Sequence, residues 1–93
     1  MAYYNRGLAY SGKEDYDKAI TSYTEAIWLN PNNAGYYVDR GLAYSGKKDY
    51  DRAEADFDAA LRIDPDNERA KLGETLVFLH TLMRRAEAEV AGE

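Results

Sequence analysis

Small and aromatic side chains recur along the chain at intervals of three and four residues. Ala19, Tyr23 and Ala26 are spaced in this way, and Ala53 and Phe57 begin a second segment with the same spacing. Apolar residues at these intervals fall on one face of an α-helix, whereas a half-buried strand would alternate apolar and polar residues. The pattern therefore predicts amphipathic helices and no strands.

The sequence also carries the residues that begin and end helices. Asp15 and Asp49 are suited to cap the N-terminus of a helix. Pro31 and Pro65 follow the helices that begin at these caps and end them, because proline disfavours helical geometry in the residue before it. The predicted helices span about residues 2–12, 16–29, 34–46, 50–63 and 67–90. The expected fold class is all-α.

The chain repeats itself at an interval of about 34 residues. Residues 6–13 read RGLAYSGK, and residues 40–47 read the same letters. Such a period is typical of solenoids, in which each unit is a pair of helices that buries its apolar surface against the next unit. The expected architecture is an α-solenoid of two antiparallel helix-turn-helix repeats followed by a longer C-terminal helix.

The two copies resemble the tetratricopeptide repeat (TPR), whose signature is an ordered set of aromatic, Gly, Tyr, Ala and Pro positions. In the first copy these positions hold Tyr3, Gly7, Tyr10, Ala19, Tyr23, Ala26 and Pro31. In the second copy they hold Tyr37, Gly41, Tyr44, Ala53, Phe57, Ala60 and Pro65. The resemblance implies a single TPR-like domain over residues 1–93, with repeat 1 at about 1–33, repeat 2 at about 34–67 and the C-terminal helix at about 68–93.

Two positions depart from the family pattern in both copies. Arg6 and Arg40 stand where the family usually has a large apolar residue. Glu14 and Lys48 occupy a turn position that is often glycine. A long arginine stem can cover apolar surface while its charged head reaches water, so the packing at this position stays open.

The resemblance also implies a function, because the first helices of such hairpins line a concave groove that binds peptide segments. The expected groove residues are Tyr4, Asn5, Leu8, Val38, Asp39, Leu42, Arg69, Leu72 and Leu76. Most of them are apolar, which suits an apolar anchor held in register by a few polar groups. The alternative is that Leu8, Leu42 and Leu76 pack as core residues.

Some members of the family hold the C-terminal carboxylates of a partner with Lys, Asn and Arg at set groove positions. Tyr4, Leu8, Asp39 and Gly73 occupy four of those positions here, and only Arg69 lies near such a role. The resemblance therefore implies a groove without this carboxylate clamp.

The last predicted helix is apolar almost all round in its middle. Only His80 and Thr81 interrupt the apolar residues of this part, so one hairpin cannot cover all of them. These residues are Leu76, Val77, Phe78, Leu79, Leu82 and Met83. We expect one face to contact the second hairpin and another to contact a partner, a second copy or further protein. Self-association as a homodimer through this helix, or its exchange between protomers, is the alternative function.

Composition narrows the classes of partner. The chain has 93 residues, a net charge of −5 and no cysteine. Its basic residues are scattered among acids, which does not favour binding to nucleic acid or to an anionic membrane. No apolar stretch is long enough to span a membrane, and the lack of cysteine excludes disulfides. We expect a soluble, cytoplasmic protein whose partner is another protein or peptide.

Residues that could support catalysis or metal binding are few. His80 is the only histidine, and no carboxylate lies three or four residues from it. We expect it to be a packed or interfacial side chain. The acidic segment 64–67 lacks the glycine and distal glutamate of a calcium loop. The sequence therefore predicts an interaction scaffold with no catalytic residues, no cofactor and no metal.

Overall fold

The computed structural model describes residues 2–92. Its helices are α1 (Ala2–Gly12), α2 (Tyr16–Leu29), α3 (Ala34–Gly46), α4 (Tyr50–Ile63) and α5 (Glu68–Ala91). Each predicted helix is present with its ends within one residue of the expected positions, and the described residues contain no strand. The all-α prediction is confirmed.

Four side chains cap the N-termini of the helices that follow α1. Asp15, Asn33, Asp49 and Asn67 each accept a hydrogen bond from the backbone N–H three residues further along. Each bond satisfies an N–H group that has no partner within the helix, and such a cap contributes about 1 kcal/mol to helix stability. The turns therefore hold the helix starts at defined places in both repeats.

The tight turn inside each hairpin contains a residue with a left-handed backbone. Glu14 has φ 60° and Lys48 has φ 66°. A side chain in this conformation costs about 1 kcal/mol, because Cβ approaches the following carbonyl oxygen. The departure from glycine at this position is therefore a small cost to stability and does not change the turn.

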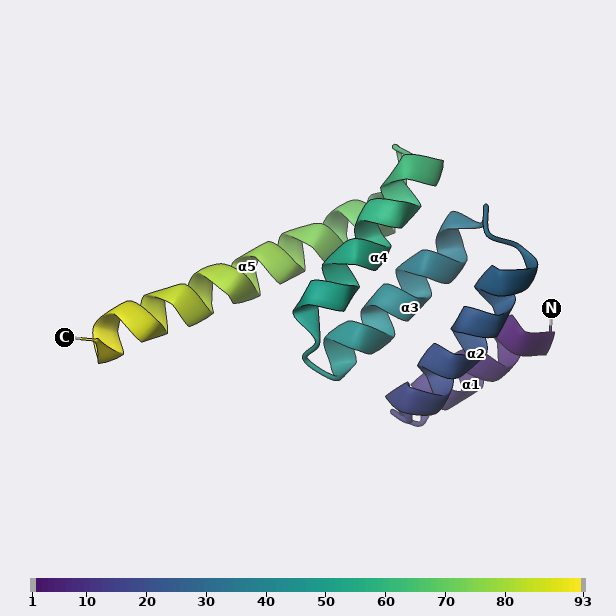
Figure 1. Ribbon diagram of the computed structural model, residues 1–93, viewed down its shortest axis with the longest axis horizontal. Coiled ribbons are helices and arrows are strands. Elements are labelled where there is room, and N and C mark those ends of the chain that lie inside the picture. Colours follow the sequence, from purple (N-terminus) through teal and green to yellow (C-terminus); the bar gives the residue numbers. More distant parts are fainter. Residues whose placement is uncertain (1, 93) are drawn as a thin grey trace.

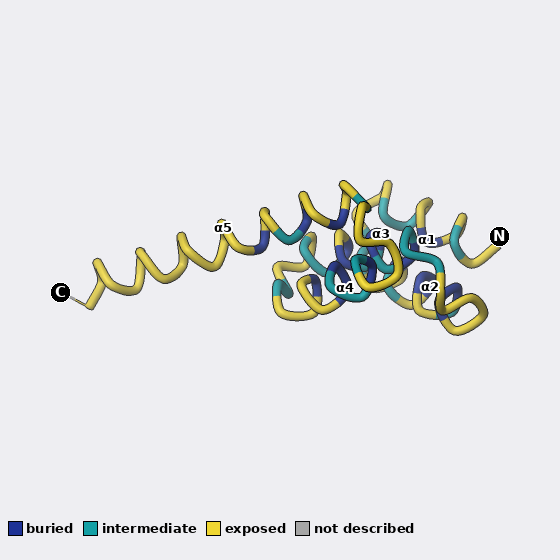
Figure 2. The backbone as a smooth tube through the Cα atoms, turned by 90° about the horizontal axis from the view of Figure 1, so that it is seen from above, coloured by how far each residue is buried: buried dark blue, intermediate teal, exposed yellow. Residues whose placement is uncertain are grey.

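The helices form two layers. One layer contains α1, α3 and α5, and the other contains α2 and α4 (Figure 2). Consecutive helices run in opposite directions, and α3 packs against each of the other four helices (Figure 1). The two hairpins thus stack side by side, and the first part of α5 continues the stack.

Close approach within each hairpin depends on one glycine and one aromatic ring. A Cβ atom placed on Gly7 would lie 2.5 Å from the ring of Tyr23. A Cβ atom on Gly41 would lie 2.7 Å from the ring of Phe57. Both rings are almost fully buried. Any larger residue than glycine would push the two helices of the hairpin apart.

Arg6 and Arg40 stand where the family usually has a large apolar residue. They form polar bonds between the two helices of their hairpins. Arg40 donates to both carboxylate oxygens of Asp56, at 2.8 and 2.7 Å, and this pair is largely shielded from water. In the first hairpin Arg6 donates instead to Ser22 at 2.9 Å and to the more exposed Glu25 at 2.6 Å. The second hairpin therefore contains a bidentate ion pair in place of an apolar contact.

Only the first part of α5 is docked. Ala70, Gly73 and Val77 are buried against the second hairpin, as expected for one face of this helix. Every residue from Phe78 to Gly92 is exposed, and beyond its first turn this part projects away from the body as a single helix (Figure 2). Among residues 2–92, no helix combines the length and the hydropathy needed to cross a bilayer.

Candidate functional site

The groove face is the outer side of the α1, α3 and α5 layer. Its accessible residues include four leucines, each between 40 and 62% exposed, and the polar side chain of Asn5. The leucines are Leu8, Leu42, Leu72 and Leu76. Each leucine is therefore partly open to solvent and accessible to a bound segment.

Val38 does not belong to this face, and the expectation for it is wrong. Its side chain is fully buried in a cluster with Phe57, Ala70 and Val77. The same repeat position is occupied by Leu72 in α5, which is exposed. The difference arises because α4 and α5 cover Val38, whereas no described helix follows α5.

A polar cluster joins the three helices of the groove layer. The hydroxyl of Tyr4 donates to one oxygen of Asp39 at 2.7 Å, and Arg69 donates to the other oxygen at 2.5 Å. The carboxylate of Asp39 is buried, so it is not free to orient a bound segment, in contrast to the expectation for this residue. The cluster instead links α1, α3 and α5 into a single surface.

Burial and the hydrogen bond to Asp39 raise the pKa of Tyr4 to about 12. The phenol therefore keeps its proton at neutral pH and remains a donor to the carboxylate. The ring of Tyr4 also packs 4.9 Å from that of Tyr36, centroid to centroid. These contacts make the position of the Tyr4 side chain well defined.

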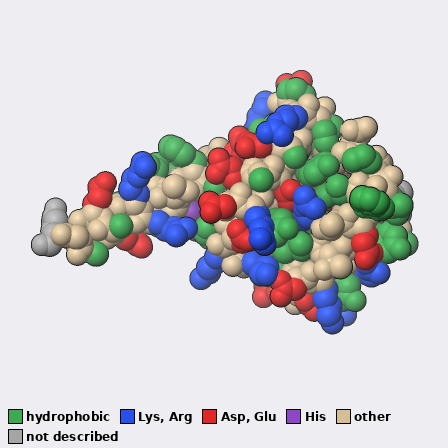
Figure 3. Space-filling model, viewed as in Figure 1, with side chains coloured by type: hydrophobic (Ala, Val, Ile, Leu, Met, Phe, Trp, Pro, Cys, Tyr) green, Lys and Arg blue, Asp and Glu red, His purple; other side chains and the backbone are tan. Residues whose placement is uncertain are grey.

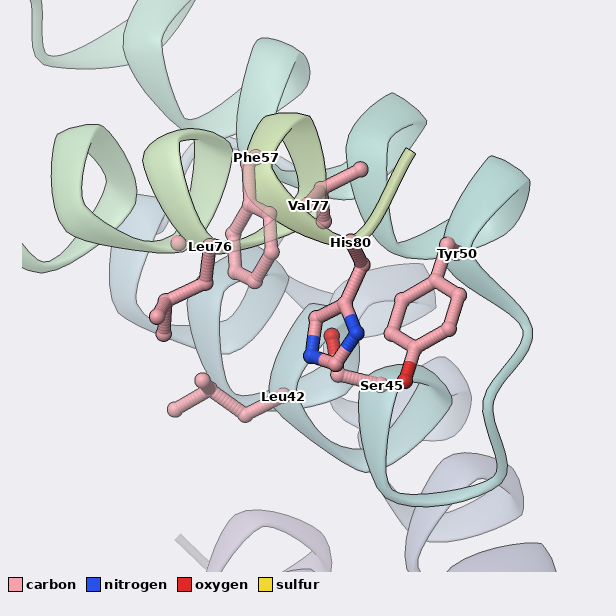
Figure 4. Close-up of a pocket in the computed structure, with 8 residues that line it drawn as sticks. Leu42, Ser45, Tyr50, Phe57, Leu76, Val77 and His80 are labelled. Carbon is pink, nitrogen blue, oxygen red and sulfur yellow. The ribbon is translucent and has the colours of Figure 1, made fainter. Parts of the chain in front are cut away.

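A pocket of about 110 Å³ opens between the second hairpin and α5. It is lined by Leu42, Ser45, Tyr50, Phe57, Gly73, Leu76, Val77 and His80. Leu42 and Leu76 lie on one side of it, and the imidazole of His80 lies beside the ring of Tyr50 on the other (Figure 4). A dry cavity of 150 Å³ can hold benzene, so this smaller pocket suits a branched aliphatic side chain.

His80 was expected to be a packed or interfacial side chain, and it lies in the wall of this pocket. Its ring stacks on Tyr50 with the centroids 4.6 Å apart and the planes 17° from parallel. The repeat offers a signal for this role, because a shift of one repeat places His80 on Gly46. A ring at a position that holds glycine in the preceding repeat leaves α5 less closely packed on the hairpin.

A second depression lies on the opposite side of α5. Glu54, Asp58 and Glu74 gather where α4 meets α5, and Figure 3 shows acidic side chains over this junction. Hydrogen bonding with Asp58, burial and the charges of Asp58 and Glu54 raise the pKa of Glu74 to about 7. Within residues 2–92, no group of three or more His, Cys, Asp or Glu side chains is placed to hold a metal ion.

Comparison with known families identifies the repeat. The sequence pattern described as "Tetratricopeptide repeat" matches residues 1–33 and again residues 34–67. No curated protein sequence matches the chain.

Solved TPR domains have the same fold. The Arabidopsis OM64 TPR domain is 34% identical with a TM-score of 0.84, and the match covers 94% of this chain and 71% of that one. The yeast Sti1 TPR2B domain, in a complex with pHsp70, is 26% identical with a TM-score of 0.85, covering 95% and 70%. The second TPR domain of human RPAP3, in complex with the HSP70 peptide SGPTIEEVD, is 27% identical with a TM-score of 0.78, covering 81% of this chain and 62% of that domain.

Proposed function

The chain belongs to the tetratricopeptide repeat family, and from this premise we propose that it is an interaction module that holds a peptide or helix segment of another protein along its groove face. The observation that carries this proposal is the pocket between Leu42 and Leu76, which opens among accessible leucines. Sites for peptide segments combine an apolar anchor pocket with a few polar groups that set register. Ser45 and His80 supply such groups inside the pocket.

The chemistry of the groove face favours an apolar anchor over an acidic terminus. Two similar domains are described with peptides that end in Glu-Glu-Val-Asp. Here the positions that some family members use to bind terminal carboxylates hold Tyr4, Leu8, Asp39 and Gly73. The remaining cation, Arg69, is already bonded to Asp39. We therefore assign to the partner segment one branched aliphatic side chain in polar surroundings.

The substitution Leu42→Glu tests this proposal. It places a charge at the mouth of the pocket, and we expect at least a hundredfold loss of affinity, because an unpaired carboxylate would be desolvated by the bound side chain. Binding is measured by fluorescence titration of synthetic peptides that carry one leucine, isoleucine or valine among polar residues. The melting temperature should change little, since Leu42 is 40% exposed.

Leu29→Glu is the matched control, because Leu29 is also an exposed leucine but belongs to α2 in the other layer. This variant should bind as the wild type does. If Leu42→Glu unfolds the chain, Leu42 is a core residue and the assignment of the groove fails. Equal loss of binding in both variants would also contradict the proposal.

Self-association through α5 is the second candidate function. It is favoured by the exposure of Phe78, Leu79, Leu82 and Met83, which are all large apolar side chains on the projecting half of the helix. A group of such residues on a surface usually marks an interaction site. Light scattering over a range of concentrations tests this candidate, and the double change Leu79→Lys with Met83→Lys should yield a monomer. An unchanged mass after that change would remove it.

A further inference from the structure

The exposed side of α5 carries a regular apolar seam. Leu72, Leu76, Leu79, Met83, Ala86 and Val90 follow one another at alternating spacings of four and three residues. This is the spacing of the a and d positions of a coiled coil, which place one narrow apolar stripe along a helix. All six residues are exposed. The stripe runs over almost the whole length of the helix.

This seam is distinct from the face by which α5 docks. The docked residues Ala70, Gly73 and Val77 point toward the second hairpin. At about 100° per residue, the middle of the seam lies about a third of a turn from the middle of the docked face, and Leu76 is the seam residue nearest to that face. A partner helix can therefore lie along the seam without displacing α5 from the body. Phe78 lies on neither face.

The seam is complementary to itself when two copies run in opposite directions. If the pair is centred on Thr81, Leu79 lies beside Met83 of the second copy, and Leu72 lies beside Val90 of the second copy. Each contact then pairs an a position with a d position, as antiparallel coiled coils require. The smallest seam residue, Ala86, lies beside Leu76 of the second copy.

The flanking residues also favour the antiparallel direction. Leu82 borders the seam, and antiparallel pairing places it beside Leu82 of the second copy. On the same side, Thr75 comes beside Glu89 of the second copy. In a parallel pair Leu82 would instead face the carboxylate of Glu87, which would be desolvated without a partner. The polarity of the residues beside Leu82 therefore favours the antiparallel direction.

Building on the proposed self-association, we infer that α5 of a second copy is the occupant of this seam, and that the two helices pair antiparallel about Thr81. The tail of each copy then lies against Leu72 and Leu76 of the other. These two leucines also border the groove face, and Leu76 lines its pocket. The second copy therefore covers part of the peptide site, and dimerisation and peptide binding compete.

Site-directed cross-linking tests the direction of pairing. Because the sequence contains no native cysteine, each introduced cysteine is the single site of reaction. In an antiparallel pair, a short bis-maleimide should cross-link two copies of the Leu82→Cys variant through their single cysteines. Leu72→Cys variants should not, because the two Leu72 positions would lie about 27 Å apart along the helix axis. Cross-linking through Leu72→Cys would overturn the antiparallel arrangement.

Sedimentation velocity of full-length variants tests the seam itself. Leu79→Lys with Met83→Lys should raise the dimer dissociation constant about a hundredfold, because both side chains lie at the centre of the seam. Ala88→Lys is the matched control, because Ala88 is exposed and lies nearly half a turn from the seam, and it should change the constant less than threefold. An equal effect of Ala88→Lys would overturn the seam while self-association stands. A wild-type chain that stays monomeric at every concentration removes self-association as well, and leaves the Leu42→Glu test of peptide binding untouched.

Discussion

Two interfaces hold the stack together. The first joint is the interface between the two hairpins, and the second joint is the interface between the second hairpin and α5. Both use the same repeat positions, with different residues at some of them. At the joint between the hairpins, Tyr16 lies so close to Gly46 that a Cβ atom there would be 2.6 Å from its ring. At the joint between the second hairpin and α5, Tyr50 meets His80 at the corresponding position. At this position the first joint has a ring against glycine, whereas the second joint has two stacked rings.

The polar residues of the two joints differ in charge. Across the first joint Arg40 donates to Thr24 at 3.2 Å. One repeat later these positions hold Glu74 and Asp58, two acids that face each other. A donor and an acceptor attract, while two carboxylates attract only when they share a proton. The second joint therefore lacks the attraction between Arg40 and Thr24.

The aromatic residue inside each hairpin completes the contrast. The hydroxyl of Tyr23 forms a hydrogen bond with Ser11 at 3.1 Å. Phe57 stands at the matching position of the second hairpin and has no hydroxyl to fill the space near Ser45, which lines the pocket. A few changes at repeat positions therefore turn a closely packed joint into one that contains a pocket.

The largest effect should come from breaking the closed joint. Gly46→Ala should lower the free energy of unfolding by about 1 to 2 kcal/mol, because Tyr16 must move out of its contact. Gly12→Ala is the matched control, since nothing lies within 4 Å of a Cβ atom there. This variant should be more stable by about 0.5 to 1 kcal/mol, since alanine favours the helix. Urea unfolding measures both, and equal effects would contradict the difference between the two positions.

An intermediate effect should come from exchanging the aromatic residues. Tyr23→Phe should lower the free energy of unfolding by about 1 kcal/mol, because the bond to Ser11 is lost. Phe57→Tyr should leave stability within about 1 kcal/mol of the wild type, because the new hydroxyl can reach Ser45. It should also weaken binding of apolar peptides about tenfold by filling the pocket. Unaltered peptide affinity in Phe57→Tyr would argue against this pocket as the anchor site.

The smallest effect concerns the paired acids of the second joint. The pKa of Glu74 is raised to about 7, so the folded state binds this proton more tightly than the unfolded state does. This contribution to stability is present in full below about pH 4.5 and is lost as the pH rises through 7. Glu74→Gln should melt about 2 °C above the wild type at pH 8 and equally at pH 4. Thermal scans of the wild type and the variant at both pH values measure this, and a difference of the same size at pH 4 and pH 8 would contradict it.

Much of the fold could be predicted because its signals are local or periodic. Caps such as Asp15 and Asn33 depend on their own helix, and the pairing of Gly41 with Phe57 is repeated by Gly7 with Tyr23. A feature that occurs twice at a fixed interval is visible without any knowledge of tertiary contacts. The architecture of two hairpins and a longer helix was therefore predicted correctly.

The candidate site could be predicted only in part. The four expected leucines are accessible, but Val38 is buried and Asp39 is already bonded to Tyr4 and Arg69. Position in the repeat does not reveal which neighbour covers a side chain or claims its charge. The groove assignment, self-association through α5 and the cytoplasmic location stay predictions.

The sequence by itself determined the helices, the repeat and the close packing of the two helices within each hairpin. These features depend on the spacing of residues and on the size of neighbouring side chains. Only the tertiary structure decided which surfaces stay open. Val38 and Leu72 occupy one repeat position, yet one is covered and the other exposed. The physical reason is that burial belongs to a contact between elements, and the next element along the stack is different for each repeat.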